Sequence, residues 1–139
     1  MKNFIRLVFL SILYAVFFVI EVELILNVYR ISRLINVEVE LLSIFIAVII
    51  ILLVTLSTYL FYVLNKRYLK RSKWNYLSCL ICMPFIFLFI SLFTSLFPMI
   101  NEGDRPAPIL GLFYWISLVI YPFYLSIIIG IAGNQKRNR

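Results

Sequence analysis

The residues best suited to chemistry stand near the end of the first apolar segment. Glu23, Asn27 and Arg30 occur at i, i+4 and i+7 in the stretch IEVELILNVYR, so a continuous helix places them on one face. Glu21 points away from that face. Such a stripe can hold an intramolecular ion pair, or line a small vestibule that handles cations or protons. These four residues are the candidate ion or charge-pair site.

The depth of the two glutamates decides between structural and functional roles. A helix that enters an apolar layer at Phe4 reaches Glu23 after about 20 residues, which is the length that crosses a layer about 30 Å thick. The sequence therefore predicts that Glu21 and Glu23 lie at the outer rim, where charges are cheap and ion pairs are common. A helix that starts at Leu7 would place both deeper and favour a functional role.

Two cysteines form the motif CLIC, with Cys79 and Cys82 at i and i+3. CxxC is a redox or metal signature in the right setting. Four-helix membrane oxidoreductases that exchange disulfides with quinones need a second cysteine pair, and this chain has two Cys in total and no His. A thiol oxidoreductase is therefore disfavoured, and we expect both cysteines to be buried packing residues without a metal.

No catalytic set is visible in the rest of the chain. The absence of His removes Ser–His and Cys–His arrangements, and four glycines leave no phosphate-binding loop. We predict that the protein is not an enzyme and has no cofactor.

A dense basic cluster lies in the middle of the chain, within NKRYLKRSKWN. It can contact anionic lipid, since each charge near a membrane surface contributes about 1 kcal/mol. The segment is too short to present a nucleic-acid-binding module, so nucleic acid is not an expected partner. The candidate lipid-contact residues are Lys66, Arg67, Lys70, Arg71 and Lys73.

Long uncharged segments must position these residues. The chain is 64% hydrophobic and 14% charged, and both Leu41–Leu64 and Trp74–Asn101 lack any charge. About 20 helical residues cross a bilayer, and lipid requires helices because it cannot satisfy exposed backbone groups. The sequence predicts an all-α integral membrane four-helix bundle with short connecting loops, forming one domain over residues 1–139, with spans at about 4–26, 41–64, 76–100 and 109–133. We read the connector after the first span as a continuation of the helix or an interfacial piece.

Basic residues predict the orientation, because Lys and Arg accumulate on the cytoplasmic side. With both termini inside, ten of the 13 basic residues are cytoplasmic, and three (Arg30, Arg33 and Arg105) are external. We therefore expect an N-in, C-in protein of the cell membrane. Its richness in Ile, Phe, Lys and Asn is typical of an AT-rich bacterial genome, and hence of a bacterial plasma membrane.

Small residues four apart predict which spans pack together, because they let helix backbones approach closely. The pairs Ser11/Ala15 and Ser126/Gly130 fall in the inner half, and the pairs Ser43/Ala47 and Ser91/Ser95 fall in the outer half. This predicts contact between the first and fourth spans and between the second and third. Ser91 and Gly130 would then be contact positions, while Phe87 and Ile128 would partly face lipid.

Three functions are compatible with these features. The rim placement of the glutamates favours a non-enzymatic accessory, immunity or assembly protein, with the lipid bilayer and a membrane protein or a second copy as partners. The alternative is a small homo-oligomeric cation- or drug-coupled transporter that uses Glu21 and Glu23. Small multidrug exporters also have four spans and a glutamate in the first, but theirs lies near mid-membrane and their helices are rich in glycine. The disfavoured thiol oxidoreductase is the third.

Overall fold

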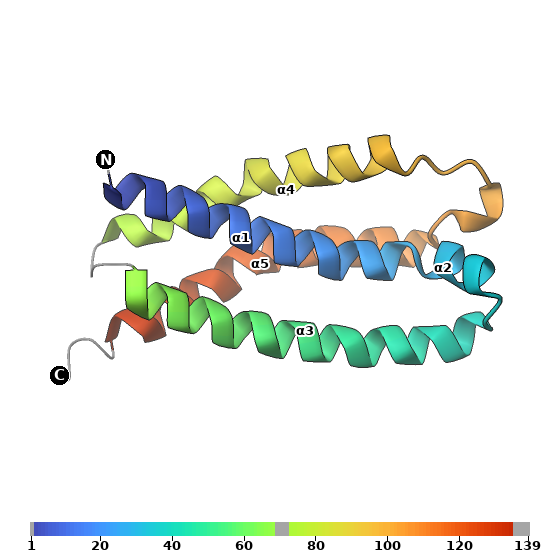
Figure 1. Ribbon diagram of the computed structural model, residues 1–139, viewed down its shortest axis with the longest axis horizontal. Coiled ribbons are helices and arrows are strands. Elements are labelled where there is room, and N and C mark those ends of the chain that lie inside the picture. The colour runs from blue at the N-terminus through green and yellow to red at the C-terminus, as the bar shows by residue number, and fades with distance from the viewer. Residues whose placement is uncertain (1, 69–72, 135–139) are drawn as a thin grey trace.

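The computed structural model describes residues 2–68 and 73–134, and it is helical almost throughout. Four long helices lie side by side, α1 (Lys2–Leu26), α3 (Val39–Tyr68), α4 (Leu77–Leu96) and α5 (Pro108–Asn134) (Figure 1). Three shorter elements complete the chain, the eight-residue helix α2 (Val28–Ile35) and the 3₁₀ turns η1 (Lys73–Tyr76) and η2 (Glu102–Asp104). The start of α1 and the end of α5 lie at one end of the bundle, and α2 and η2 lie at the other. The predicted all-α fold with four long helices is confirmed.

All four helices are long and apolar enough to cross a membrane. The predicted boundaries agree within two residues except at two ends: α3 continues to Tyr68, beyond the predicted Leu64, and α4 ends at Leu96 and not near Ile100. Pro98 explains the early end, because the residue before a proline is pushed out of the helical conformation. Phe97 accordingly has φ −126° and ψ 66°.

The connector after α1 is itself helical. α1 ends at Leu26, and Asn27 separates it from α2 with φ −97° and ψ 13°. α2 ends at Asn36, which adopts the left-handed conformation (φ 52°) that asparagine tolerates better than most residues. The helical path therefore continues, with one break, from Lys2 to Ile35.

The helix pairing predicted from small residues is only partly right, because α1 does contact α5, whereas α3 and α4 are not a principal contact pair among the described residues. α1 packs most extensively against α4, and α3 packs against both α5 and α1. Ser11 faces α4, where its hydroxyl donates to the Ser78 carbonyl at 3.1 Å. Small residues do not bring α3 and α4 together, because the pairs Ser43/Ala47 and Ser91/Ser95 are all exposed. Ser hydroxyls at these exposed sites bond to their own helix instead of a neighbour.

Aromatic and aliphatic side chains fill the space where α1 meets the other helices. The Tyr14 ring packs edge-on against Phe61 of α3, with ring centroids 4.7 Å apart. Phe18 packs against Tyr121 of α5 with centroids 4.5 Å apart. Ile128, which we expected to face lipid, is only 5% exposed and belongs to this core.

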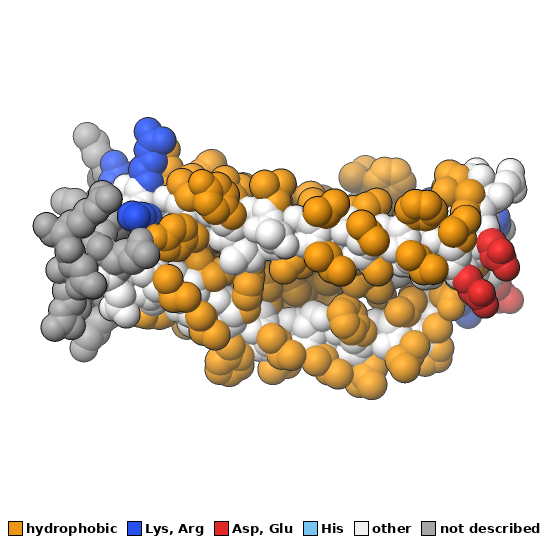
Figure 2. Space-filling view, turned by 90° about the horizontal axis from the view of Figure 1, so that it is seen from below, with side chains coloured by type: hydrophobic (Ala, Val, Ile, Leu, Met, Phe, Trp, Pro, Cys, Tyr) orange, Lys and Arg blue, Asp and Glu red, His pale blue; other side chains and the backbone are white. Residues whose placement is uncertain are grey.

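Most charged side chains of the described residues lie near the two ends of the molecule. Figure 2 shows Lys and Arg at the end where α1 starts, Asp and Glu together with some Lys or Arg at the opposite end, and a belt of apolar side chains between them. Large apolar side chains of this belt are exposed on all four long helices. Such a surface is far more apolar than that of a water-soluble monomer.

Candidate functional site

Glu21 lies beside the middle of the neighbouring helices. The Ser57 hydroxyl of α3 donates to its carboxylate at 3.4 Å. Ser57 comes seven residues before Leu64, the last residue of the uncharged stretch of α3, which is about 10 Å along a helix.

The register between α1 and α4 also places Glu21 away from the helix ends. The Ser11 hydroxyl bonds to the Ser78 carbonyl, and the Arg30 guanidinium bonds to the Phe97 carbonyl, so both contacts pair residues 67 apart. This offset sets Glu21 opposite Leu88, near the middle of α4 (Leu77–Leu96). Glu21 therefore lies beside the middle of α4, and not beside an end of that helix as the predicted rim position would require. The first turns of α1 extend past the start of α4, and α2 continues the helical path beyond Asn27.

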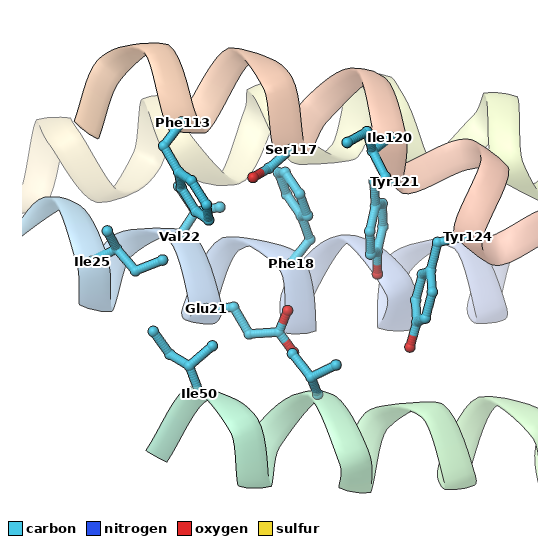
Figure 3. Close-up of a pocket in the computed structure, with 11 residues that line it drawn as sticks. Phe18, Glu21, Val22, Ile25, Ile50, Phe113, Ser117, Ile120, Tyr121 and Tyr124 are labelled. Atoms are coloured by element: carbon cyan, nitrogen blue, oxygen red, sulfur yellow. The ribbon is translucent and has the colours of Figure 1, made fainter. Parts of the chain in front are cut away.

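Glu21 lines a pocket between α1, α3 and α5. The pocket has a volume of about 260 Å³, somewhat below the range of drug-sized sites. Figure 3 shows the rings of Tyr121 and Tyr124 reaching from α5 toward the side of the pocket where Glu21 lies. The lining residues are Phe18, Glu21, Val22, Ile25, Ile50, Val54, Phe113, Ser117, Ile120, Tyr121 and Tyr124.

The pocket is an apolar and aromatic space with one acidic group. No basic side chain in residues 2–68 and 73–134 forms an ion pair with Glu21. Its hydrogen bond from Ser57 is long, and a single long bond compensates a buried carboxylate poorly. Aromatic faces attract organic cations, and a carboxylate adds a full opposite charge. The pocket therefore has the chemistry to hold a small cation that also carries apolar surface.

The predicted charge-pair stripe is only partly assembled. The Asn27 amide donates to the Glu23 carboxylate at 2.8 Å, so these two residues do meet. Arg30 instead turns to α4, where it donates to the Phe97 carbonyl at 3.0 Å and lies 5.9 Å from the centre of that ring. Glu21 faces α3, away from the other three. The four residues therefore lie at three separate places, with Glu21 in the pocket, Glu23 paired with Asn27, and Arg30 on Phe97.

The two cysteines are buried and free. The Cys79 sulfur lies 3.6 Å from the Ser126 hydroxyl, and the Cys82 thiol donates to the Cys79 carbonyl at 3.1 Å. Within the described residues, no three acidic, Cys or His side chains are grouped in a way that suits a metal.

The basic cluster is described only in part. Lys66 and Arg67 belong to the last turn of α3, and Lys73 begins η1, whereas Lys70 and Arg71 fall outside the described residues. The Arg67 guanidinium lies 5.7 Å from the centre of the Tyr68 ring.

At the end of the bundle where α2 and η2 lie, the structure shows an ion pair that the sequence analysis did not predict. Arg33 of α2 donates to both oxygens of Asp104 in η2, at 2.8 and 2.7 Å. Asp104 is 2% exposed, and the hydrogen bonds from Arg33 lower the pKa of its carboxyl. The partners are 71 residues apart, so no local spacing could identify them. The pocket aromatics of α5 were also missed, although Phe113, Ser117 and Tyr124 recur at the spacing of one helix face.

The chain matches no protein-family model, and no similar curated protein or solved structure is found.

Proposed function

We propose that this protein is a multi-pass membrane protein that binds and carries a small lipophilic organic cation at Glu21. The supporting observation is a carboxylate without an ion-pair partner among the described residues, set beside the middle of the helices and within an aromatic pocket. Intramembrane acidic residues are expensive and are generally retained for transport or proton handling.

Membrane insertion is supported by four apolar helices and by the belt of apolar side chains between the two charged ends. The basic residues favour a topology with both termini in the cytoplasm. In that orientation Arg67 is inside, and the Arg33–Asp104 pair is outside. The bacterial plasma membrane suits this composition.

A cation in the pocket would neutralise Glu21 and place its apolar groups against aromatic rings. The rings of Tyr121 and Tyr124 reach toward the carboxylate's side of the pocket, the Phe18 ring lines it toward α5, and such rings would supply cation–π attraction. A proton can neutralise the same carboxylate when the cation leaves. Alternate occupancy by a proton and an organic cation is a simple basis for exchange, and it requires no enzymatic step.

The position of Glu21 is the reason to prefer a carrier over an accessory protein. The accessory interpretation rested on glutamates at the rim, where they would only mark topology. Glu21 instead contacts Ser57, well inside the uncharged part of α3.

The test is uptake of benzyltrimethylammonium, a small aromatic quaternary ammonium ion, into proteoliposomes with an outward-directed proton gradient. We expect Glu21→Gln to reduce initial uptake at least about tenfold, because it removes the charge and the exchangeable proton. The matched control is Glu40→Gln, which removes an exposed carboxylate at the start of α3 and should transport normally. Equal uptake by Glu21→Gln and the parent would refute the proposed function.

A further inference from the structure

The break between α1 and α2 exposes oxygen atoms that the Glu21 pocket does not use. Two backbone hydrogen bonds bridge it, from the Asn27 amide to the Glu23 carbonyl and from the Ile31 amide to the Asn27 carbonyl. Within the described chain, no backbone amide of α2 bonds to the last three carbonyls of α1. Interrupted helices use such carbonyls to coordinate ions in membrane transporters.

The Asn27 side chain adds a buried acceptor at this break. Its amide nitrogen donates to the Glu23 carbonyl at 2.9 Å and to the Glu23 carboxylate at 2.8 Å. Its oxygen, Oδ1, is buried and receives no hydrogen bond from any described group. Asn27 is only 6% exposed, and a buried amide oxygen without a donor is unfavourable.

The two side chains together lack a positive partner. The Asn27 amide nitrogen faces the Glu23 carboxylate, and Oδ1 is a further oxygen acceptor on the same side chain. Arg30, the nearest basic residue along the chain, is engaged with the Phe97 carbonyl. Apolar residues pack around the break, with Val28, Leu42 and Ile46 forming a buried cluster. An ion at this position would supply the missing charge and the missing partner of Oδ1.

We propose that Glu23 and Asn27 form a binding site for a monovalent inorganic cation, with sodium as the occupant. Hard cations take carboxylate, amide and backbone carbonyl oxygens, which are the groups at the break. One carboxylate balances one positive charge, whereas a divalent ion would leave excess charge among apolar side chains. The site is separate from the Glu21 pocket, and it does not depend on whether that pocket carries organic cations.

The test is the melting temperature of the purified full-length protein in detergent, as NaCl replaces N-methyl-D-glucamine chloride at constant ionic strength. Sodium that binds the folded state should raise the melting temperature by about 5 °C when its concentration is about ten times the dissociation constant. An unchanged melting temperature would overturn the proposal.

Variants assign the response to this site. Glu23→Gln should abolish the sodium-dependent shift, and Glu40→Gln should keep it. Asn27→Asp, which retains an oxygen and adds charge, should produce the shift at lower sodium concentration, whereas Asn27→Leu should lose it. A shift that persists in both Glu23→Gln and Asn27→Leu would refute binding at this break. If Glu23→Gln does not fold, the sodium-dependent shifts of Asn27→Asp and Asn27→Leu still test the site: equal shifts in these two variants would refute it.

Discussion

A buried hydrogen bond between α1 and α3 gives the sharpest test of the packing. The Tyr14 hydroxyl donates to the Asn65 Oδ1 atom at 2.7 Å, and the two residues are 0% and 3% exposed. The Asn65 side-chain nitrogen has no partner among the described groups. Tyr14→Phe would therefore leave the whole Asn65 amide without a partner inside the bundle.

Two known ranges set the expected loss of unfolding free energy in Tyr14→Phe. Leaving a buried polar group unsatisfied costs about 1–3 kcal/mol. Hydrogen bonds between membrane helices average about 0.6 kcal/mol and reach about 1.7 kcal/mol. Because neither residue is accessible to water, we expect Tyr14→Phe to lower the free energy of unfolding by about 1–2 kcal/mol.

A double-mutant cycle separates the bond from side-chain bulk. Asn65→Leu removes both amide atoms, so Tyr14→Phe made in that background should cost at least about 1 kcal/mol less than in the parent. Reversible unfolding by sodium dodecyl sulfate in mixed micelles measures each variant. The control is Tyr59→Phe, at a site of α3 that is 68% exposed, and this substitution should change the free energy of unfolding by less than about 0.5 kcal/mol. The reasoning fails if Tyr14→Phe behaves like Tyr59→Phe, or if the two core substitutions are additive.

Three further predictions concern topology, pH and packing. Glu102→Cys, at a well-exposed position in η2, should react with an impermeant maleimide in intact cells, and Arg67→Cys should react only after permeabilisation; the reverse pattern would invert the bundle. The pKa of Asp104 is lowered by its arginine partner from an ordinary value of 3.8, so the ion pair stabilises the fold above that value and its contribution disappears as pH falls through the lowered pKa. The difference in melting temperature between the parent and Asp104→Asn should accordingly be constant above about pH 5 and shrink below about pH 4, and a difference independent of pH would contradict the pair. Ile128→Ala should destabilise the protein by about 2–4 kcal/mol in the same unfolding assay, and Phe87→Ala, at a site 49% exposed, by clearly less; equal losses would contradict the observed burial.

The sequence was sufficient for the class of fold because composition and length leave few choices. Uncharged segments long enough to span a bilayer can only be helices there, and turn residues such as Pro98 and the charged connectors set their ends. Helix pairing was predictable only in part, because small residues allow close contact without choosing the partner. Ser11 does mark a contact, but its neighbour is α4.

Prediction of the candidate site required the register of α1 against its neighbouring helices, which local sequence does not contain. Counting from Phe4 placed Glu21 at the rim, since about 20 residues suffice for one crossing. The first turns of α1 extend beyond the start of α4, and the helical path continues into α2 after the break at Asn27. Only the contacts with Ser57 and with α4 reveal this shift in register. The aromatic face of α5 that completes the pocket lies more than 90 residues away in the chain.

Direct binding of benzyltrimethylammonium to the purified protein, followed by isothermal titration calorimetry, is the most direct test of the Glu21 pocket. We expect saturable binding to the parent, and affinity reduced at least about tenfold in Glu21→Gln, which corresponds to about 1.4 kcal/mol. Glu40→Gln should bind as the parent does. Undiminished binding to Glu21→Gln, or no saturable binding to the parent, would contradict the assignment of Glu21 as the cation-binding residue.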